Sequence, residues 1–161
     1  MIKKPVRALT RIIVGTDGSN ESKDSVEFLR QLPLLKPMHV TVLAAVPPLP
    51  FLGEKPTRTA SSITEKLRAA LEADGRKLVS RVARDLRRAG LDANGVVTRG
   101  LPALEIMKLA ETDRADLIVV GAHGRRSARE YLMGSVSDSV VKYAPCSVLV
   151  YRRPHEFWRG G

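Results

Sequence analysis

Short apolar runs alternate with longer segments of helical periodicity along almost the whole chain, and this alternation restricts the fold more than any other feature. Runs so short and continuous are typical of strands buried on both faces of a parallel sheet, with helices as the crossovers. Right-handed crossovers and short connections favour a single doubly wound α/β fold with five parallel strands and helices on both faces. The predicted strands are 11–16, 39–46, 94–98, 115–120 and 147–151.

The first two helices are predicted from caps, breakers and apolar spacing. One begins at Ser19 or Asn20 and ends before Pro33. The stretch 47–62 holds four prolines and is predicted to be a surface loop. A long helix then runs from Ser62 or Thr64 to Gly90, with an apolar stripe made of Ile63, Leu67, Leu71, Leu78, Val82 and Leu86.

Two shorter helices complete the predicted order βαβαβαβαβ. The third begins near Pro102, because a proline in the first turn loses no helical hydrogen bond. Its core-facing residues are expected to be Leu104, Met107, Leu109 and Ala110. The fourth is predicted over 136–143.

Composition indicates one domain, predicted over 1–153, with a basic tail over 154–161. No apolar stretch reaches the roughly 18 residues of a membrane helix. A single cysteine, Cys146, cannot form an internal disulfide and favours a reducing, cytoplasmic location. The net charge of +10 permits contact with nucleic acid or an anionic membrane, but no nucleic-acid motif accompanies the basic runs, so we expect solvated basic faces.

The candidate site lies at the carboxyl ends of the predicted strands, where ligands of doubly wound sheets bind. This edge holds Thr16 and Asp17, Val46, and the loop that starts at Gly121. Gly121 and Gly124 carry no side chain where the backbone leaves the fourth strand, so a ligand can approach the amides closely.

The end of this loop has the chemistry of an anion site. Gly134 opens the last helix, and Ser135 and Ser137 supply hydroxyl groups. The unpaired amides of a first helical turn and the helix dipole favour phosphate. The loop is neither a P-loop, since it lacks Gly-Lys-Ser/Thr, nor the dinucleotide fingerprint, since it follows the fourth strand. An ordinary turn with a helix cap is the alternative interpretation.

Three segments resemble the universal stress protein family in its nucleotide-binding branch. That branch is marked by Gly-x2-Gly-x9-Gly-Ser/Thr, and every position is met by Gly121, Gly124, Gly134 and Ser135. The segment from Ile13 to Ser19 resembles the first strand and aspartate of the family, and 144–150 resembles its last strand. The resemblance covers nearly the whole chain and implies an adenine nucleotide alpha hydrolase-like, Rossmann-like fold.

The resemblance implies ATP, or another adenine nucleotide, lying across the strand ends. Around adenine and ribose it places Gly15, Thr16, Asp17 and Val46, with Val120 and Gly121 under the ribose. A divalent cation such as Mg²⁺ would bridge phosphate oxygens, with Asp17 nearby. The phosphates would be held by Gly124, Gly134, Ser135, Val136 and Ser137.

Three side chains of this region have two interpretations each. His123 is expected to serve as a structural hydrogen-bonding group rather than in proton transfer. Asp17 either accepts from a ribose hydroxyl or stabilises a turn. Arg125 either reaches terminal phosphates or lies in a solvated loop.

The implied function is a stress-response or signalling module that acts through nucleotide-dependent conformation or partner binding. No nucleophile–base–orienter set is visible, so at most slow ATP hydrolysis or autophosphorylation at Ser135 or Ser137 is an alternative. Cyclic AMP is an alternative ligand, and a basic nucleic-acid or membrane-associated protein is an alternative function. The family commonly dimerises by pairing last strands, so we expect a homodimer through the apolar edge from Val148 to Tyr151.

Overall fold

Strands and helices alternate along the chain in the predicted order. The computed structural model describes residues 9–32, 38–49, 58–124 and 133–153. The strands of this part are β1 (Arg11–Gly15), β2 (His39–Val46), β3 (Asp92–Arg99), β4 (Leu117–Gly121) and β5 (Ser147–Tyr151). The helices are α1 (Asn20–Gln31), α2 (Arg58–Arg88), α3 (Pro102–Thr112) and α4 (Ser135–Tyr143). The predicted tail over 154–161 lies outside the described residues.

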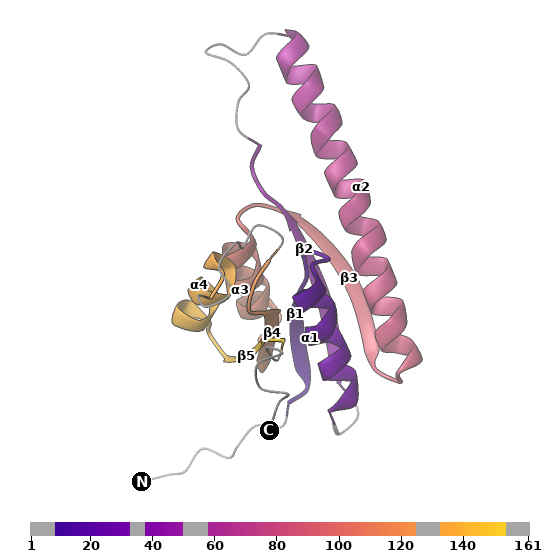
Figure 1. Ribbon diagram of the computed structural model, residues 1–161, viewed down its shortest axis with the longest axis vertical. Coiled ribbons are helices and arrows are strands. Elements are labelled where there is room, and N and C mark those ends of the chain that lie inside the picture. The colour runs from indigo at the N-terminus through magenta and orange to yellow at the C-terminus, as the bar shows by residue number, and fades with distance from the viewer. Residues whose placement is uncertain (1–8, 33–37, 50–57, 125–132, 154–161) are drawn as a thin grey trace, which may run out of the picture.

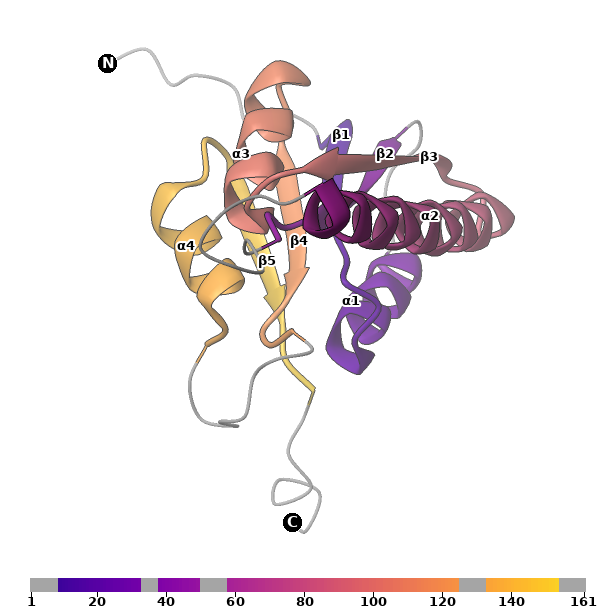
Figure 2. The same ribbon diagram turned by 90° about the horizontal axis from the view of Figure 1, so that it is seen from above.

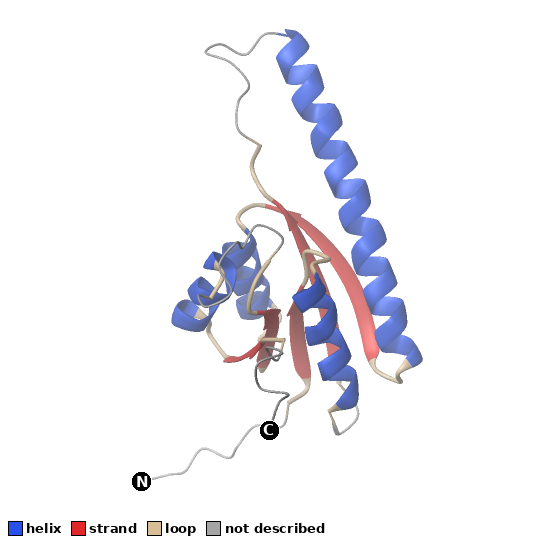
Figure 3. Ribbon diagram, in the orientation of Figure 1, coloured by secondary structure: helices blue, strands red, loops and turns tan. Residues whose placement is uncertain are grey.

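The five strands form one parallel sheet in the order β3-β2-β1-β4-β5 (Figure 3). Ile12 of β1 lies opposite both Val40 of β2 and Leu117 of β4. The strand order therefore reverses between β1 and β4, which confirms the predicted doubly wound sheet. Because β1 and β4 are parallel, their carboxyl ends, Gly15 and Gly121, lie at the same edge of the sheet, next to this reversal.

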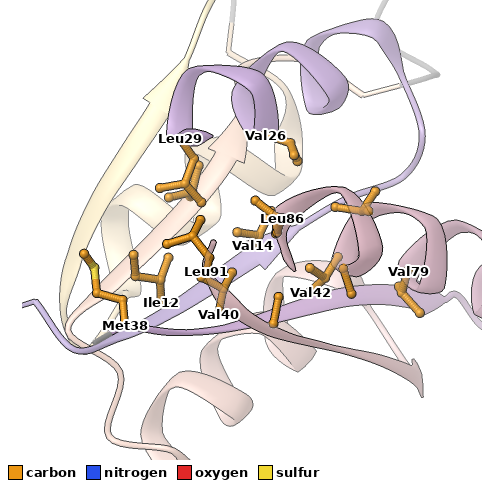
Figure 4. Close-up of a cluster of buried hydrophobic side chains, with 14 of the residues drawn as sticks. Ile12, Val14, Val26, Leu29, Met38, Val40, Val42, Val79, Leu86 and Leu91 are labelled. Atoms are coloured by element: carbon orange, nitrogen blue, oxygen red, sulfur yellow. The ribbon is translucent and has the colours of Figure 1, made fainter. Parts of the chain in front are cut away.

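Two helices cover each face of the sheet, as seen from above in Figure 2. On the face of α1 and α2, the strand residues Ile12, Val14 and Val42 pack against Leu29 and Leu86 (Figure 4). The opposite core holds Ile13, Leu43, Ile118 and Val120 from the strands, with Ile106 of α3 and Val140 of α4. Consecutive strand residues thus point into different cores, which is why the apolar runs are continuous.

Helix α2 starts earlier than predicted, at Arg58 rather than at Ser62 or Thr64. Pro56 is the last proline of the preceding stretch, and the Thr-Ala-Ser-Ser segment that follows Arg58 contains no residue that breaks a helix. The prediction of a loop as far as Ser62 is therefore wrong for 58–62. Its middle part, 50–57, lies outside the described residues.

Only half of the predicted apolar stripe of α2 packs on the sheet. Val82 and Leu86 are buried, whereas Ile63, Leu67 and Leu71 are 52%, 46% and 36% exposed. Figure 1 shows the amino-terminal half of α2 projecting past the ends of the strands. A helix of 31 residues is about 46 Å long, and the 8 residues of β2 span about 27 Å, so the sheet is too short to cover α2.

The core face of α3 differs from the prediction at two positions. Leu104 is 47% exposed, so its expected place in the core is wrong, and Ile106, which was not predicted, is buried. Ala110, four residues after Ile106 and hence on the same face, is buried as expected. Leu109 packs at the margin of this core, and Met107 is partly buried. Among the described residues, no helix is both long and apolar enough to cross a bilayer.

Candidate functional site

The turn after β1 is held by hydrogen bonds to the neighbouring strand β2 and to the start of α1. The Thr16 amide donates to the Leu43 carbonyl (2.9 Å), and the buried Thr16 hydroxyl lies 3.0 Å from the Ser22 hydroxyl. Ser19 caps α1 by accepting from the Ser22 amide (3.2 Å). The Thr16 side chain therefore ties the turn to the first turn of α1.

Asp17 stabilises this turn and also faces the loop after β4. Its Oδ1 accepts from the Ser19 amide (2.9 Å), which is the turn-stabilising role weighed as one alternative. A Cβ atom added at Gly124 would lie 2.9 Å from Asp17 Oδ2. The Asp17 carboxylate therefore lies beside the loop after β4. It fits there because Gly124 has no side chain.

Two more glycines of the predicted site allow elements to pack closely. A Cβ atom at Gly121 would lie 3.0 Å from the backbone of Glu21 and Ser22, in the first turn of α1. A Cβ atom at Gly15 would lie 2.7 Å from Ile106 Cδ1. At these positions the missing side chain makes room for a helix of the protein itself, a use that the sequence-based prediction of ligand approach did not anticipate.

The segment 121–124 is fixed by hydrogen bonds on several sides. The Ala122 amide donates to the Tyr151 carbonyl of β5 (2.7 Å). The Ala122 carbonyl accepts from the Gly134 amide (2.7 Å) and from the Ser137 hydroxyl (2.8 Å). The end of β4 is thereby joined to β5 and to the start of α4.

His123 has the structural hydrogen-bonding role that was expected, and its partner is Glu21. The His123 amide donates to Glu21 Oε2, and His123 Nδ1 lies 2.9 Å from Glu21 Oε1. Both side chains are largely buried, at 13% and 19% exposure. Sequence reasoning missed Glu21, because an acidic residue in a first helical turn is ordinary and its partner lies 102 residues away.

The start of α4 lies beside the end of β4. Gly134 is the N-cap and makes no side-chain capping bond. A Cβ atom at Gly134 would lie 3.7 Å from the Gly124 nitrogen, so the Gly124 amide adjoins the first turn of α4. Ser135 is exposed there, whereas Ser137 is 2% exposed and donates to backbone carbonyls. Backbone amides gathered in this way can hold an anion.

The other predicted residues lie at or near the same edge. Val46 and Val120 are buried in the cores, at 6% and 3% exposure. Val136 is partly buried against the core between α3 and α4, and Arg125 falls outside the described residues. In the part of the chain that the structure describes, no three His, Cys, Asp or Glu side chains are grouped as a metal site.

Cys146 is a partly buried residue packed at the margin of the core near α3 and α4. Burial, and secondarily Asp116, raise the pKa of its thiol. A thiol with a raised pKa is a poor nucleophile, so Cys146 has the environment of a small core residue rather than that of a redox centre.

A hollow of about 420 Å³ lies at the opposite, amino-terminal edge of the sheet, lined by Arg11, His39 and Arg114 among others. Two of these basic side chains already have partners, since Arg11 Nη1 donates to the Asp113 carbonyl (2.9 Å) and His39 Nδ1 lies 2.8 Å from Asp92 Oδ2. Asp113 also lines the hollow, and helix α3 ends beside the hollow with the partial negative charge of a helix C-terminus. The carboxyl edge, with its amides and the reversal of strand order, is the better anion site.

Comparison with known proteins gives one consistent result. The family model described as the universal stress protein family matches residues 8–152. Universal stress protein MJ0531 of Methanocaldococcus jannaschii is 30% identical over 144 residues, covering 89% of this chain and 82% of that protein. The solved structure of MJ0577, from the same organism, has a TM-score of 0.81 at 24% identity and covers 93% of this chain and 100% of that one.

Two further solved structures share the fold and carry ligands. A universal stress protein in complex with cAMP has a TM-score of 0.61 at 23% identity, covering 91% of this chain and 98% of that one. A universal stress protein family protein from Arabidopsis thaliana with AMP bound has a TM-score of 0.60 at 17% identity, covering 91% and 94%. At these identities the likeness shows the fold.

Proposed function

Because the chain belongs to the universal stress protein family, we propose that it binds an adenine nucleotide, ATP first, at the carboxyl edge of β1 and β4. The proposed role is a module in stress response or signalling, in which bound nucleotide favours one conformation or one partner interface. The family name and the AMP and cAMP complexes of proteins with this fold support the proposal.

One observation carries the proposal: the backbone amide of Gly124 adjoins the first turn of α4 at the point where the strand order reverses. Amides converging on one place suit a chain of phosphates, whose oxygens only accept hydrogen bonds at neutral pH. In this proposal the phosphates lie against the Gly124 amide, the Ser135 hydroxyl and the backbone amides of Ser135, Val136 and Ser137. Gly134, whose own amide donates to the Ala122 carbonyl, contributes by having no side chain there. The base and ribose lie toward Gly15, Thr16, Asp17, Val46, Val120 and Gly121.

A magnesium ion would be carried by the phosphates in this proposal. The described residues offer Asp17 as a nearby carboxylate and no group of three metal ligands. Mg²⁺ keeps several waters and is commonly held by one or two carboxylates together with substrate phosphates, so this arrangement fits it. The ion would neutralise phosphate charge near Asp17.

Calorimetric titration with ATP and magnesium tests the proposal. The wild-type chain is expected to bind, and Gly124→Val is expected to weaken binding at least about tenfold, which is about 1.4 kcal/mol. The reason is that any Cβ at this position displaces Asp17 Oδ2, and two further methyl groups cover the amide. Gly75→Ala is the matched control and should bind like wild type, because Gly75 of α2 packs against Val97 of the edge strand β3 rather than against β1 or β4.

Parallel titrations with AMP and cAMP separate the ligand alternatives. If the phosphate chain supplies the binding energy, affinity should rise with the number of phosphates, and cAMP should bind more weakly than ATP. Tighter binding of cAMP would make the cyclic nucleotide the ligand. A wild-type chain that binds none of the three would contradict the proposed function.

Two further parts of the proposal concern assembly and location. We propose a homodimer through β5, which among the described residues pairs only with β4 and has no strand on its other side. A cytoplasmic location is proposed because ATP is available there and the lone Cys146 suits a reducing compartment.

A further inference from the structure

Glu21 makes a double contact with the loop that follows β4. One carboxylate oxygen accepts from the His123 amide, and the ring atom Nδ1 lies 2.9 and 3.0 Å from the two oxygens. Glu21 stands in the first turn of α1, directly against the backbone of Gly121. Helix α1 is therefore hydrogen-bonded to the loop through the carboxylate of Glu21.

This contact completes the fixation of the segment 121–124. Ala122 is already held on both sides, by the Tyr151 carbonyl of β5 and by Gly134 and Ser137 of the α4 start. His123 is held by Glu21. Glu21 is thus the group on α1 that sets the direction of the peptide leading into Gly124.

The chemistry of the pair makes the contact both strong and directional. A carboxylate only accepts hydrogen bonds, so His123 carries its ring proton on Nδ1 when it faces Glu21. Hydrogen bonds to a carboxylate are about twice as strong as neutral ones, and here both groups are mostly shielded from water. The pair fixes the backbone and the ring of His123 together.

We propose that Glu21 is a positioning residue for the phosphates of the nucleotide. This inference depends on the proposed function, since it assumes a nucleotide at this edge. By holding His123, Glu21 sets the Gly124 amide beside the first turn of α4 before the ligand arrives, so less ordering remains when phosphates bind. The segment 121–124 leads to the phosphate-binding amides, so the effect of Glu21 grows with the phosphate chain and is absent for adenosine.

A first measurement examines the loop without ligand, by amide hydrogen exchange of the full chain. In Glu21→Ala the His123 amide is expected to exchange at least about tenfold faster than in wild type, because local opening no longer breaks a bond to a carboxylate. Glu27→Ala is the matched control, since Glu27 lies on the same helix and pairs with Arg30 at the surface. It should leave exchange at His123 unchanged.

A second measurement compares adenosine, AMP and ATP by calorimetric titration. Glu21→Ala is expected to weaken ATP binding about tenfold and leave adenosine binding within about twofold of wild type. Glu21→Gln keeps one acceptor oxygen without the charge, so its affinity for ATP should lie between the affinities of wild type and Glu21→Ala. Thermal unfolding of each variant identifies any that fails to fold, and Glu21→Gln then carries the comparison.

The outcomes separate this inference from the proposed function. Unchanged exchange at His123, equal losses for adenosine and ATP, or tighter ATP binding in Glu21→Ala would each overturn the positioning role. The last result would mean that the carboxylate competes with phosphate for the loop. A wild-type chain that binds no nucleotide overturns the proposed function and the phosphate role with it, while exchange at His123 still decides whether Glu21 holds the loop.

Discussion

At the scale of single residues, the two serines at the start of α4 differ in burial and in hydrogen bonding. Ser137 is buried, and its hydroxyl lies 2.8 Å from the Ala122 carbonyl and 2.9 Å from the Gly134 carbonyl. Ser135 is exposed at the first position of the helix. The Ser137 hydroxyl joins α4 to the end of β4, whereas the Ser135 hydroxyl belongs to the proposed phosphate site.

Alanine substitution distinguishes these two roles. Ser137→Ala is expected to lower the free energy of unfolding by about 1 kcal/mol, since a buried hydrogen bond is lost while the Ala122 carbonyl keeps the Gly134 amide. Ser135→Ala is expected to change stability by less than about 0.5 kcal/mol and to weaken ATP binding. Urea unfolding and calorimetry measure both. A stability loss confined to Ser135→Ala would reverse the assignment.

At the scale of elements, α1 connects the candidate site with the end of β5. Its first turn holds His123 through Glu21. Later in the helix, the Phe28 ring lies 5.5 Å from the ring of Tyr151, the last residue of β5, and Asp24 forms a 2.7 Å ion pair with Arg153, two residues beyond β5. The bond to Asp24 raises the pKa of the Arg153 guanidinium further above its ordinary value. One helix therefore touches both the loop after β4 and the strand proposed for dimerisation.

In helix α2, the contribution of an apolar residue to stability depends on whether it lies over the sheet. Leu86 is fully buried between the helix and the sheet, whereas Leu67 projects beyond the sheet and is 46% exposed. Leu86→Ala is expected to lower the free energy of unfolding by about 2–5 kcal/mol, and Leu67→Ala by less than about 1 kcal/mol. Chemical denaturation of both variants measures the difference. Equal losses would mean that something covers the projecting half of α2 in solution.

At the scale of the whole molecule, the sheet ends in two edge strands of different character. β3 is 8 residues long and carries Asp92 and Arg99 at its ends, and charged residues discourage pairing at an edge. β5 is short and apolar, and Val148, Leu149 and Val150 are partly buried against the helices on both faces. Its open backbone edge is the better one for a second copy.

Light scattering tests the proposed dimer. A mass of twice the 17.7 kDa of one chain is expected at micromolar concentration. Because each copy carries a net charge of +10, repulsion between copies should weaken the dimer at low salt and salt should strengthen it. Binding to nucleic acid has the opposite salt dependence. A monomer at every salt concentration would contradict the dimer.

Much of the fold follows from local patterns in the sequence. Continuous runs such as Ile12–Val14 and Leu117–Val120 need burial on both faces, and only a parallel sheet covered by helices provides it. The predictions of burial were wrong where the outcome depends on the length of a helix relative to the sheet, or on which face of a helix is turned to the sheet. Leu67 has the spacing of a core residue, but its burial depends on how far the sheet extends beneath α2, which spacing does not encode. Leu104 is exposed because α3 turns the face of Ile106 and Ala110 to the sheet.

By itself, the sequence determined the order of elements and the glycine-and-serine loop, because each depends on residues near one another in the chain. The doubly wound sheet followed from that order together with the general rules for crossovers between parallel strands. Only the tertiary structure decided which groups pack against those glycines and which residue holds the loop after β4. Gly121 faces the first turn of α1, Gly124 faces Asp17, and His123 meets Glu21 from 102 residues away. Contacts between distant segments arise only when the sheet brings their ends to one edge, so no local pattern could predict Glu21.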